Sequence, residues 1–264
     1  MLVDYTLFGV VDKVQQAIDL LRQHEPPEGY YVCFSGGKDS VVLLDLVIRS
    51  GVKFDAHHSV TTVEPPELMR FIRDYYPFVQ KESPKYTMAQ LIVRRKMPPL
   101  RVNRYCCQTL KERKGFGRFK VTGIRNAESI RRVKRHQVED DKYSTGKFIH
   151  PIKFWSDADI WQYIHERNLP YCSLYDCGFH RIGCVLCPFE GYLQALQDLE
   201  RFPAIADYYR RACRKSFEVN RDKLTNWASG DEMFFWWIDT RRHVRIAEDC
   251  NSIPLFSEDD GSIL

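Results

Sequence analysis

Long apolar runs are missing from this 264-residue chain, and none reaches the roughly 20 residues that a membrane-spanning helix requires. The first residues also lack a basic segment followed by a hydrophobic core, as a secretory signal would have. A strong charge excess is missing too: 39 Lys and Arg face 35 Asp and Glu, and a net charge of +4 does not by itself indicate a nucleic-acid partner. We therefore expect a cytoplasmic protein with no membrane partner.

The most informative segment is Ser35-Gly36-Gly37-Lys38-Asp39-Ser40, which follows the apolar, strand-like stretch 30–34 and precedes the helix-like stretch 41–47. Glycines let the backbone approach an anion closely, while the amides at a helix N-terminus, a lysine and hydroxyls supply donors. The spacing excludes a Walker loop, which has four residues between its two glycines. We therefore predict that this segment binds phosphate or sulfate through Ser35, Gly36, Gly37, Lys38, Asp39 and Ser40.

Strand-like and helix-like segments alternate along the chain up to about residue 150. This alternation predicts an α/β fold with a parallel sheet flanked by helices. Ligands of such sheets bind beyond the carboxyl ends of the strands, where the loop at Ser35, the turn after Thr62 and the segment after Gly123 would converge. Helices are expected at 11–21, 41–47 and 67–75, and strands at 30–34, 53–62, 78–80, 119–123 and 148–152.

From Leu193 onward the pattern is mostly helical and rich in aromatic residues. These aromatics could pack a small core or stack on nucleic-acid bases, and we favour packing. We expect a nucleotide-binding domain over residues 1–190, which includes the clustered cysteines, and a helical C-terminal extension over 191–264. The aromatic residues of the extension include Tyr208, Tyr209, Phe234, Phe235, Trp236 and Trp237.

Nine cysteines in a reducing compartment indicate metal binding or thiol chemistry rather than disulfides. Cys106 and Cys107 are adjacent, and Cys184 and Cys187 form a C-x-x-C pair flanked by glycine and proline. Four thiolates suit a structural zinc or a [4Fe-4S] cluster, and spacing alone separates these poorly. Adjacent cysteines favour the cluster, because their side chains diverge. Cys172 and Cys177 are second choices as ligands, and Cys33 and Cys213 are expected to be buried apolar residues.

Several of these segments resemble one known family. Ser-Gly-Gly-Lys-Asp-Ser resembles the PP-loop of the N-type ATP pyrophosphatases and of the adenylyl-sulfate (APS) and phosphoadenylyl-sulfate (PAPS) reductases. A Cys-Cys pair, a long interval and Cys-x-x-Cys are similar to the cluster-binding arrangement of assimilatory APS reductases. Segments 122–129 and 155–161 are similar to further motifs, so the resemblance covers residues 30–190. It implies a HUP-like (adenine nucleotide alpha hydrolase-like) fold and a [4Fe-4S] cluster on Cys106, Cys107, Cys184 and Cys187.

The resemblance also places an arginine, here Arg125, at the nucleotide. We expect Lys38, Asp39 and Arg125 to be catalytic, Thr62 and Gly123 to bind the nucleotide, and Mg²⁺ to accompany ATP. The basic run that follows Arg125 could attract an anion, although for 134–136 we favour a solvated face. Glu64 and Glu67 could bind ribose or magnesium, or could serve a helix N-terminus. His57 and His58 are expected to lie inside a strand.

Two reactions fit this set of residues. In the favoured one, the enzyme adenylylates an acceptor with release of pyrophosphate, and sulfur from a donor then displaces AMP. This resembles iron–sulfur PP-loop proteins that thiolate tRNA or build DNA phosphorothioates, so a nucleic-acid acceptor is possible. In the alternative, a thiol-dependent APS or PAPS reductase releases sulfite. Reductases carry a Glu-Cys-Gly-Leu-His tail, whereas the nearest match here is 248–251, with Cys250. A non-catalytic, nucleotide-binding iron–sulfur protein is the third alternative.

Overall fold

The computed structural model describes residues 2–6, 9–142 and 144–241. Within them, a six-stranded sheet has the strand order β5-β4-β3-β6-β8-β7. Neighbouring strands are parallel from β5 to β8, and β7 runs antiparallel to β8 at one edge. The strands are β3 (Tyr30–Cys33), β4 (Phe54–Ser59), β5 (Gln80–Glu82), β6 (Phe119–Val121), β7 (Val138–Asp140) and β8 (Lys147–Ile149).

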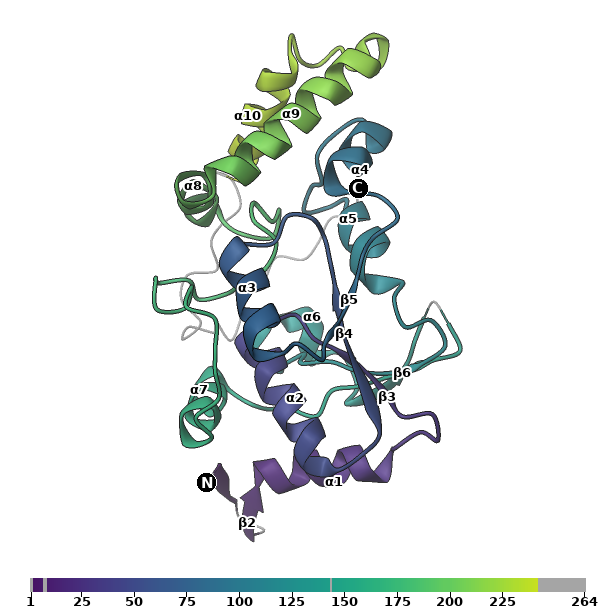
Figure 1. Cartoon of the computed structure of the whole chain (residues 1–264), viewed down its shortest axis with the longest axis vertical. Helices are drawn as coiled ribbons and strands as arrows, with labels where there is room; N and C mark the ends of the chain where they lie inside the picture. The colour runs from purple at the N-terminus through teal and green to yellow at the C-terminus, as the bar shows by residue number, and fades with distance from the viewer. Residues whose placement is uncertain (1, 7–8, 143, 242–264) are drawn as a thin grey trace, which may run out of the picture.

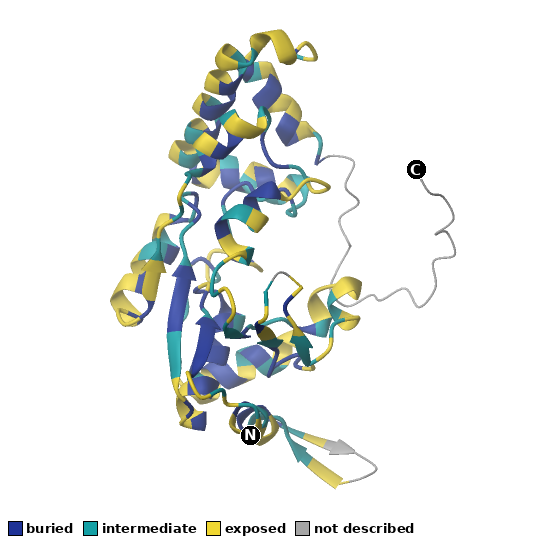
Figure 2. Ribbon diagram, turned by 90° about the vertical axis from the view of Figure 1, so that its right-hand side faces the viewer, coloured by how far each residue is buried: buried dark blue, intermediate teal, exposed yellow. Residues whose placement is uncertain are grey.

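The helix that follows the glycine turn is α2 (Lys38–Ser50), and it is buried on nearly all sides. It packs against α1 (Lys13–Gln23) and α7 (Asp157–Glu166). Because β3 and α2 are both apolar and enclosed, the turn between them is held between two buried elements (Figures 1 and 2). This rigid support fixes where the turn presents its amides.

The C-terminal helices α8 (Tyr192–Arg201), α9 (Pro203–Val219) and α10 (Gly230–Asp239) lie at the upper end of the molecule in Figure 1. There α9 packs against α10 and against α4 (Met88–Arg95), which comes from the α/β part of the chain. Tyr209, Phe234 and Trp237 are at most 3% exposed, so these aromatics are core residues, as predicted. Phe235 and Trp236 are exposed instead.

The parallel α/β sheet and the helical C-terminal part are confirmed, and the differences from expectation are local. Val11 lies in a hairpin of β1 (Val3–Thr6) and β2 (Gly9–Asp12), because Asp12 caps α1 and ends the strand. The third predicted strand begins two residues late, at Gln80, because the Val79 amide still closes a turn onto Tyr76. The antiparallel β7 was not predicted, since Val-Glu-Asp carries no apolar run.

The remaining helices are short, apart from α3 (Pro66–Tyr75), where Pro66 occupies the first turn. No helix in the described part of the chain is long and apolar enough to cross a membrane. The short elements are α5 (Tyr105–Cys107), a π-helical turn (Gln108–Glu112), two 3-10 turns (Asn126–Glu128 and Arg221–Lys223) and α6 (Ile130–Val133).

Candidate active site

The glycine turn is shaped by its own residues and by α3. Gly36 has φ +78°, and a Cβ there would lie 2.7 Å from the Leu68 Cδ1 atom, so no larger residue fits without movement. The Ser35 hydroxyl donates to the Ser40 hydroxyl (3.1 Å), which donates to the Gly37 carbonyl (2.8 Å). Gly37 is the N-cap of α2. The turn therefore presents helix N-terminal amides beside glycines, an arrangement that suits a phosphate group.

A network of four charged side chains closes one side of the turn. The guanidinium of Arg125, which is 2% exposed, donates to Asp39 Oδ1 and to Asp157 Oδ1, each at 2.6 Å. Lys38 Nζ lies 3.4 Å from Asp157 Oδ1 and 3.9 Å from Asp39 Oδ2. Although burial opposes it, the charges of Lys38 and Arg125 lower the pKa of Asp157. Two cations and two carboxylates thus meet at the start of α2, and three of them are predicted site residues.

The segment that precedes Cys184 lies over the same helix start. The Lys38 amide donates to the Tyr175 hydroxyl (2.9 Å), and Lys38 Nζ donates to the His180 carbonyl (3.4 Å). Burial raises the pKa of Tyr175, so the phenol stays protonated. The hydroxyl therefore engages an amide that a phosphate oxygen would otherwise use. Tyr175 was not predicted as a site residue. It lies far from Lys38 in the chain, and no local sequence pattern indicates their contact.

The glycine–arginine segment joins the turn, but Thr62 is engaged elsewhere. A Cβ on Gly123 would lie 3.2 Å from the Asp39 carbonyl oxygen, so this glycine allows the two segments to touch. The hydroxyl of Thr62, whose φ is +71°, accepts a hydrogen bond from the Met88 amide (3.0 Å) at the start of α4. Its role in nucleotide binding stays a prediction.

Further cations lie near the turn. Burial and the positive charge of Arg181 lower the pKa of Arg132 to about 10, while Asp39 acts in the opposite direction. Arg181, from a separate segment, is therefore close enough to repel Arg132, which forms an ion pair with Glu128. In the rest of the basic run, Lys134 and His136 are exposed, and Arg135 forms an ion pair with Glu139.

The four predicted ligand cysteines come from two segments that the fold brings together. A hydrogen bond to Cys107 and burial raise the pKa of Cys106, and charge at Cys184 and Cys187 acts in the same direction. The hydrogen bond from Cys106, with another from Arg104, lowers the pKa of Cys107 to about 5. Cys107 therefore ionises more readily than Cys106, and charge at Cys184 and Cys187 acts on the same pair.

In the described residues, no group of three or more His, Cys, Asp or Glu side chains is placed to hold a metal ion. A [4Fe-4S] cluster needs four thiolates spread around several iron atoms, and soft sulfur donors are its usual ligands. Negative charge at Cys184 and at Cys107 raises the pKa of Lys111, although burial opposes this shift. Lys111 therefore places a cation beside the thiols. Four soft sulfur donors suit a [4Fe-4S] cluster and a tetrahedral zinc ion alike.

The C-x-x-C turn is held by residues that were not predicted from the sequence. Leu186 has φ +57°, its amide donates to buried Asp198 Oδ2 (2.6 Å), and its carbonyl accepts from Arg241 Nη2 (2.9 Å). The Val185 amide donates to the Val63 carbonyl (2.9 Å), just beyond β4. The turn is thus fixed between the sheet and the C-terminal helices.

The other cysteines are free thiols, like all eight in the described residues. Cys213 is buried, as expected, whereas Cys33 is only half-buried, and desolvation raises the pKa of each thiol to about 12. Cys172 is 1% exposed, whereas Cys177 is exposed. Cys250 lies outside the described residues.

The two glutamates and two histidines considered from sequence have structural partners. Glu67 lies in the first turn of α3 and pairs with Arg201 at 3.3 Å. Glu64 accepts a hydrogen bond from the Thr61 amide. His57 and His58 are buried within β4, as predicted, and the ring of His58 contacts the Phe34 carbonyl through Nδ1 (3.0 Å).

Comparison with known proteins identifies the family of this site. Residues 29–190, more than half of the chain, match the model of the phosphoadenosine phosphosulfate reductase domain, so the chain belongs to that family. An adenosine 5'-phosphosulfate reductase of Lysinibacillus sphaericus is 30% identical over 202 residues, covering 68% of this chain and 83% of that protein. An uncharacterized protein of Methanocaldococcus jannaschii, MJ0066, is 26% identical over 80% of this chain but matches only 47% of its own length.

A solved structure supports the fold. The phosphoadenylyl-sulfate reductase of Candida auris, crystallised with phosphate, aligns with a TM-score of 0.51 and 20% identity, covering 64% of this chain and 88% of that one. The predicted PP-loop, HUP-like fold is therefore confirmed.

Proposed function

We propose that this protein is an iron–sulfur PP-loop enzyme that binds ATP with Mg²⁺ and activates an acceptor by adenylylation for sulfur transfer. The acceptor oxygen attacks the α-phosphorus, the bond to the bridging oxygen breaks, and pyrophosphate leaves. A sulfide donor then attacks the acceptor carbon, and AMP departs with the oxygen. Neither step needs an oxidant or a reductant.

The observation that carries the choice of ATP is the meeting of Asp39 and Asp157 at the PP-loop. Both carboxylates contact the same arginine, so they lie beside each other where phosphates would bind. Mg²⁺ is commonly bound by one or two carboxylates together with substrate phosphates, and Asp39 and Asp157 offer such a pair. This arrangement favours the magnesium complex of a triphosphate.

The residues of the chain then have separate tasks. The amides at the start of α2 and the Lys38 ammonium bind phosphate oxygens and stabilise the charge that develops on the leaving pyrophosphate. Buried Arg125 holds the carboxylate of Asp39 in place, because two of its donors are committed to Asp39 and Asp157. Arg132 and Arg181 supply further positive charge for the anionic acceptor or product.

The four cysteines would together hold a [4Fe-4S] cluster, which would fix the loops around it. The segment 175–182 contacts the PP-loop and leads directly into Cys184, so the two sites share one stretch of chain. The two proposed sites are therefore neighbours along this stretch, each with its own set of side chains.

The test is to follow two products from anaerobically purified, iron-loaded protein. Pyrophosphate from ATP without sulfite from APS or PAPS is the expected result. Sulfite released with a thiol reductant, and no pyrophosphate, would instead make the protein a reductase. That second candidate is favoured by the likeness to named adenosine 5'-phosphosulfate reductases. Tight nucleotide binding with neither product would support the non-catalytic alternative.

A further inference from the structure

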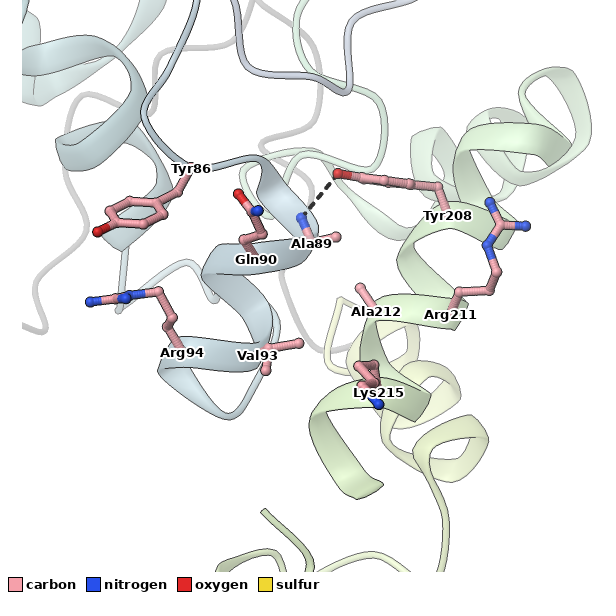
Figure 3. A pocket seen from close by; sticks show the side chains of 9 residues that line it. All are labelled: Tyr86, Ala89, Gln90, Val93, Arg94, Tyr208, Arg211, Ala212 and Lys215. Atoms are coloured by element: carbon pink, nitrogen blue, oxygen red, sulfur yellow. Dashed lines mark hydrogen bonds between the residues drawn. The ribbon is translucent and has the colours of Figure 1, made fainter. Parts of the chain in front are cut away.

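A groove of about 520 Å³ opens between α4 and α9, away from the PP-loop (Figure 3). Tyr86 and Arg94 stand on the α4 side, and Tyr208, Arg211 and Lys215 stand on the α9 side. Ala89, Val93 and Ala212 form part of its lining. Two aromatic side chains and three cations thus border one hollow of roughly nucleotide size.

The charge of the groove is positive. Among the described residues that line it there is no acidic side chain. The guanidinium of Arg94 lies 4.5 Å from the centre of the Tyr86 ring, and Lys85 Nζ lies 5.6 Å from the same centre. Arg211 and Lys215 pair with Asp207 and Glu218 on the exposed face of α9. Exposed pairs of this kind are weak, so a phosphate can replace the carboxylate at little cost.

The two tyrosines of the groove leave part of their rings exposed instead of packing fully into the core. Tyr86 and Tyr208 are half-buried, whereas the adjacent Tyr209 is 1% exposed and packs on Trp237. The Tyr208 hydroxyl accepts a hydrogen bond from the Ala89 amide (3.1 Å), which fixes the ring across the groove. A fixed aromatic ring costs little entropy when a ligand stacks on it.

From this combination we infer that the groove binds a single-stranded segment of a nucleic-acid acceptor, with a base against the tyrosines and phosphates on Arg94, Arg211 and Lys215. Aromatic faces beside cations are the recurring means of holding unpaired bases and their backbone. An acidic peptide would use the cations but not the rings. This inference rests on the proposed function, because it supplies the acceptor.

The charge contribution is tested with fluorescein-labelled 12-nucleotide single-stranded RNA and DNA in a salt series. In Arg94→Gln/Lys215→Gln, affinity should fall roughly tenfold at low salt, and the slope of log K against log salt should fall by about 1.4, for two lost phosphate contacts. The matched control is Arg22→Gln/Lys53→Gln, near α1 at the opposite end of the molecule in Figure 1, and should stay within about twofold of wild type. An equal loss of affinity in the two double variants, or no oligonucleotide binding by the wild type, would overturn the inference.

The stacking contribution is tested by Tyr86→Ala, which should weaken binding by roughly fivefold to a hundredfold, while Tyr86→Phe stays near wild type. Displacement of the oligonucleotide by polyglutamate at lower concentration than by unlabelled RNA would show an acidic protein partner and overturn the inference.

ATP affinity and pyrophosphate release are measured on the same samples. Absent pyrophosphate release with groove-dependent oligonucleotide binding would refute the proposed adenylylation but not the groove. Normal pyrophosphate release with groove-independent binding would refute the groove alone.

Discussion

The PP-loop and the cysteine site are built in opposite ways. The PP-loop is one continuous strand–turn–helix whose turn is shaped by hydrogen bonds within Ser35–Ser40, although Lys38 and Asp39 also bond to distant residues. The cysteine site joins α5 to the 184–187 turn, and Asp198 and Arg241 hold that turn from farther along the chain. A locally built site can lose a ligand contact without losing its fold. A site built from distant segments depends on tertiary packing, so damage there reaches further.

The largest expected effect lies in the cysteine site. Cys184→Ser should lose bound iron and the visible absorption of the cluster, because a hydroxyl is a poor ligand for iron–sulfur clusters. Cys177→Ser, at an exposed thiol, is the matched control and should keep its iron. Iron content and absorbance of anaerobically purified protein are measured. Full iron in Cys184→Ser, or stoichiometric zinc without iron in wild type, would contradict the proposal.

In the PP-loop, Lys38→Ala or Asp39→Ala should abolish nucleotide binding yet leave the iron content intact. Charge-assisted hydrogen bonds are worth about 1.5–3 kcal/mol each, so losing the lysine contacts lowers affinity for ATP by more than about a hundredfold. Calorimetric titration with Mg²⁺-ATP measures this, with Lys53→Ala as an exposed-lysine control. Loss of iron together with ATP binding would show that the two sites are not separable.

Asp198→Ala tests the support of the cysteine turn. It leaves the buried Leu186 amide without its acceptor, so we expect the free energy of unfolding to fall by about 1–3 kcal/mol and iron to be lost faster to a chelator. Asp198→Asn keeps an acceptor oxygen and should cost less than half as much. Urea unfolding and chelation rates provide the measurements; identical losses in both variants would argue against this hydrogen bond as the cause.

His150 tests the scaffold behind the PP-loop. Its ring is fully buried and hydrogen-bonds to Thr122 (2.7 Å), and burial lowers its pKa to about 4. The unfolded chain, with a usual pKa near 6.5, then binds more protons, so stability is complete above that pH and decreases toward pH 4. Between pH 7.5 and 5 the loss should be about 2 kcal/mol. His150→Leu should remove this part of the pH dependence in urea titrations; an unchanged dependence would exclude His150 as its source.

The smallest effect concerns Tyr175. Tyr175→Phe frees the Lys38 amide for a phosphate oxygen, so ATP should bind up to about fivefold more tightly, within the worth of one hydrogen bond. Tyr175→Leu, which also removes the ring, separates the effect of the hydroxyl from that of packing. Weaker binding by the Phe variant would mean that the hydroxyl assists the nucleotide rather than competing with it.

Local pattern predicted much of the fold, and each failure has an identifiable physical cause. The apolar strand before Ser35 and the helix after it were correct, because both are buried and their sequence shows it. The strand expected at 78–80 was displaced, since a turn at Tyr76 and Val79 delays the extended backbone. The edge strand β7 was missed, because pairing with β8 rather than its own composition makes it a strand.

By itself, the sequence determined the PP-loop, the pairing of cysteines with a C-x-x-C turn, and the family. These depend on residue type and short spacing, which the chain carries locally. Only the tertiary structure decided that Arg125 is committed to Asp39 and Asp157, that Tyr175 engages the Lys38 amide, and that α4 and α9 form a groove. Each of these contacts joins residues far apart in the chain. No local pattern encodes them, because they arise from packing the sheet, the cysteine turn and the C-terminal helices together.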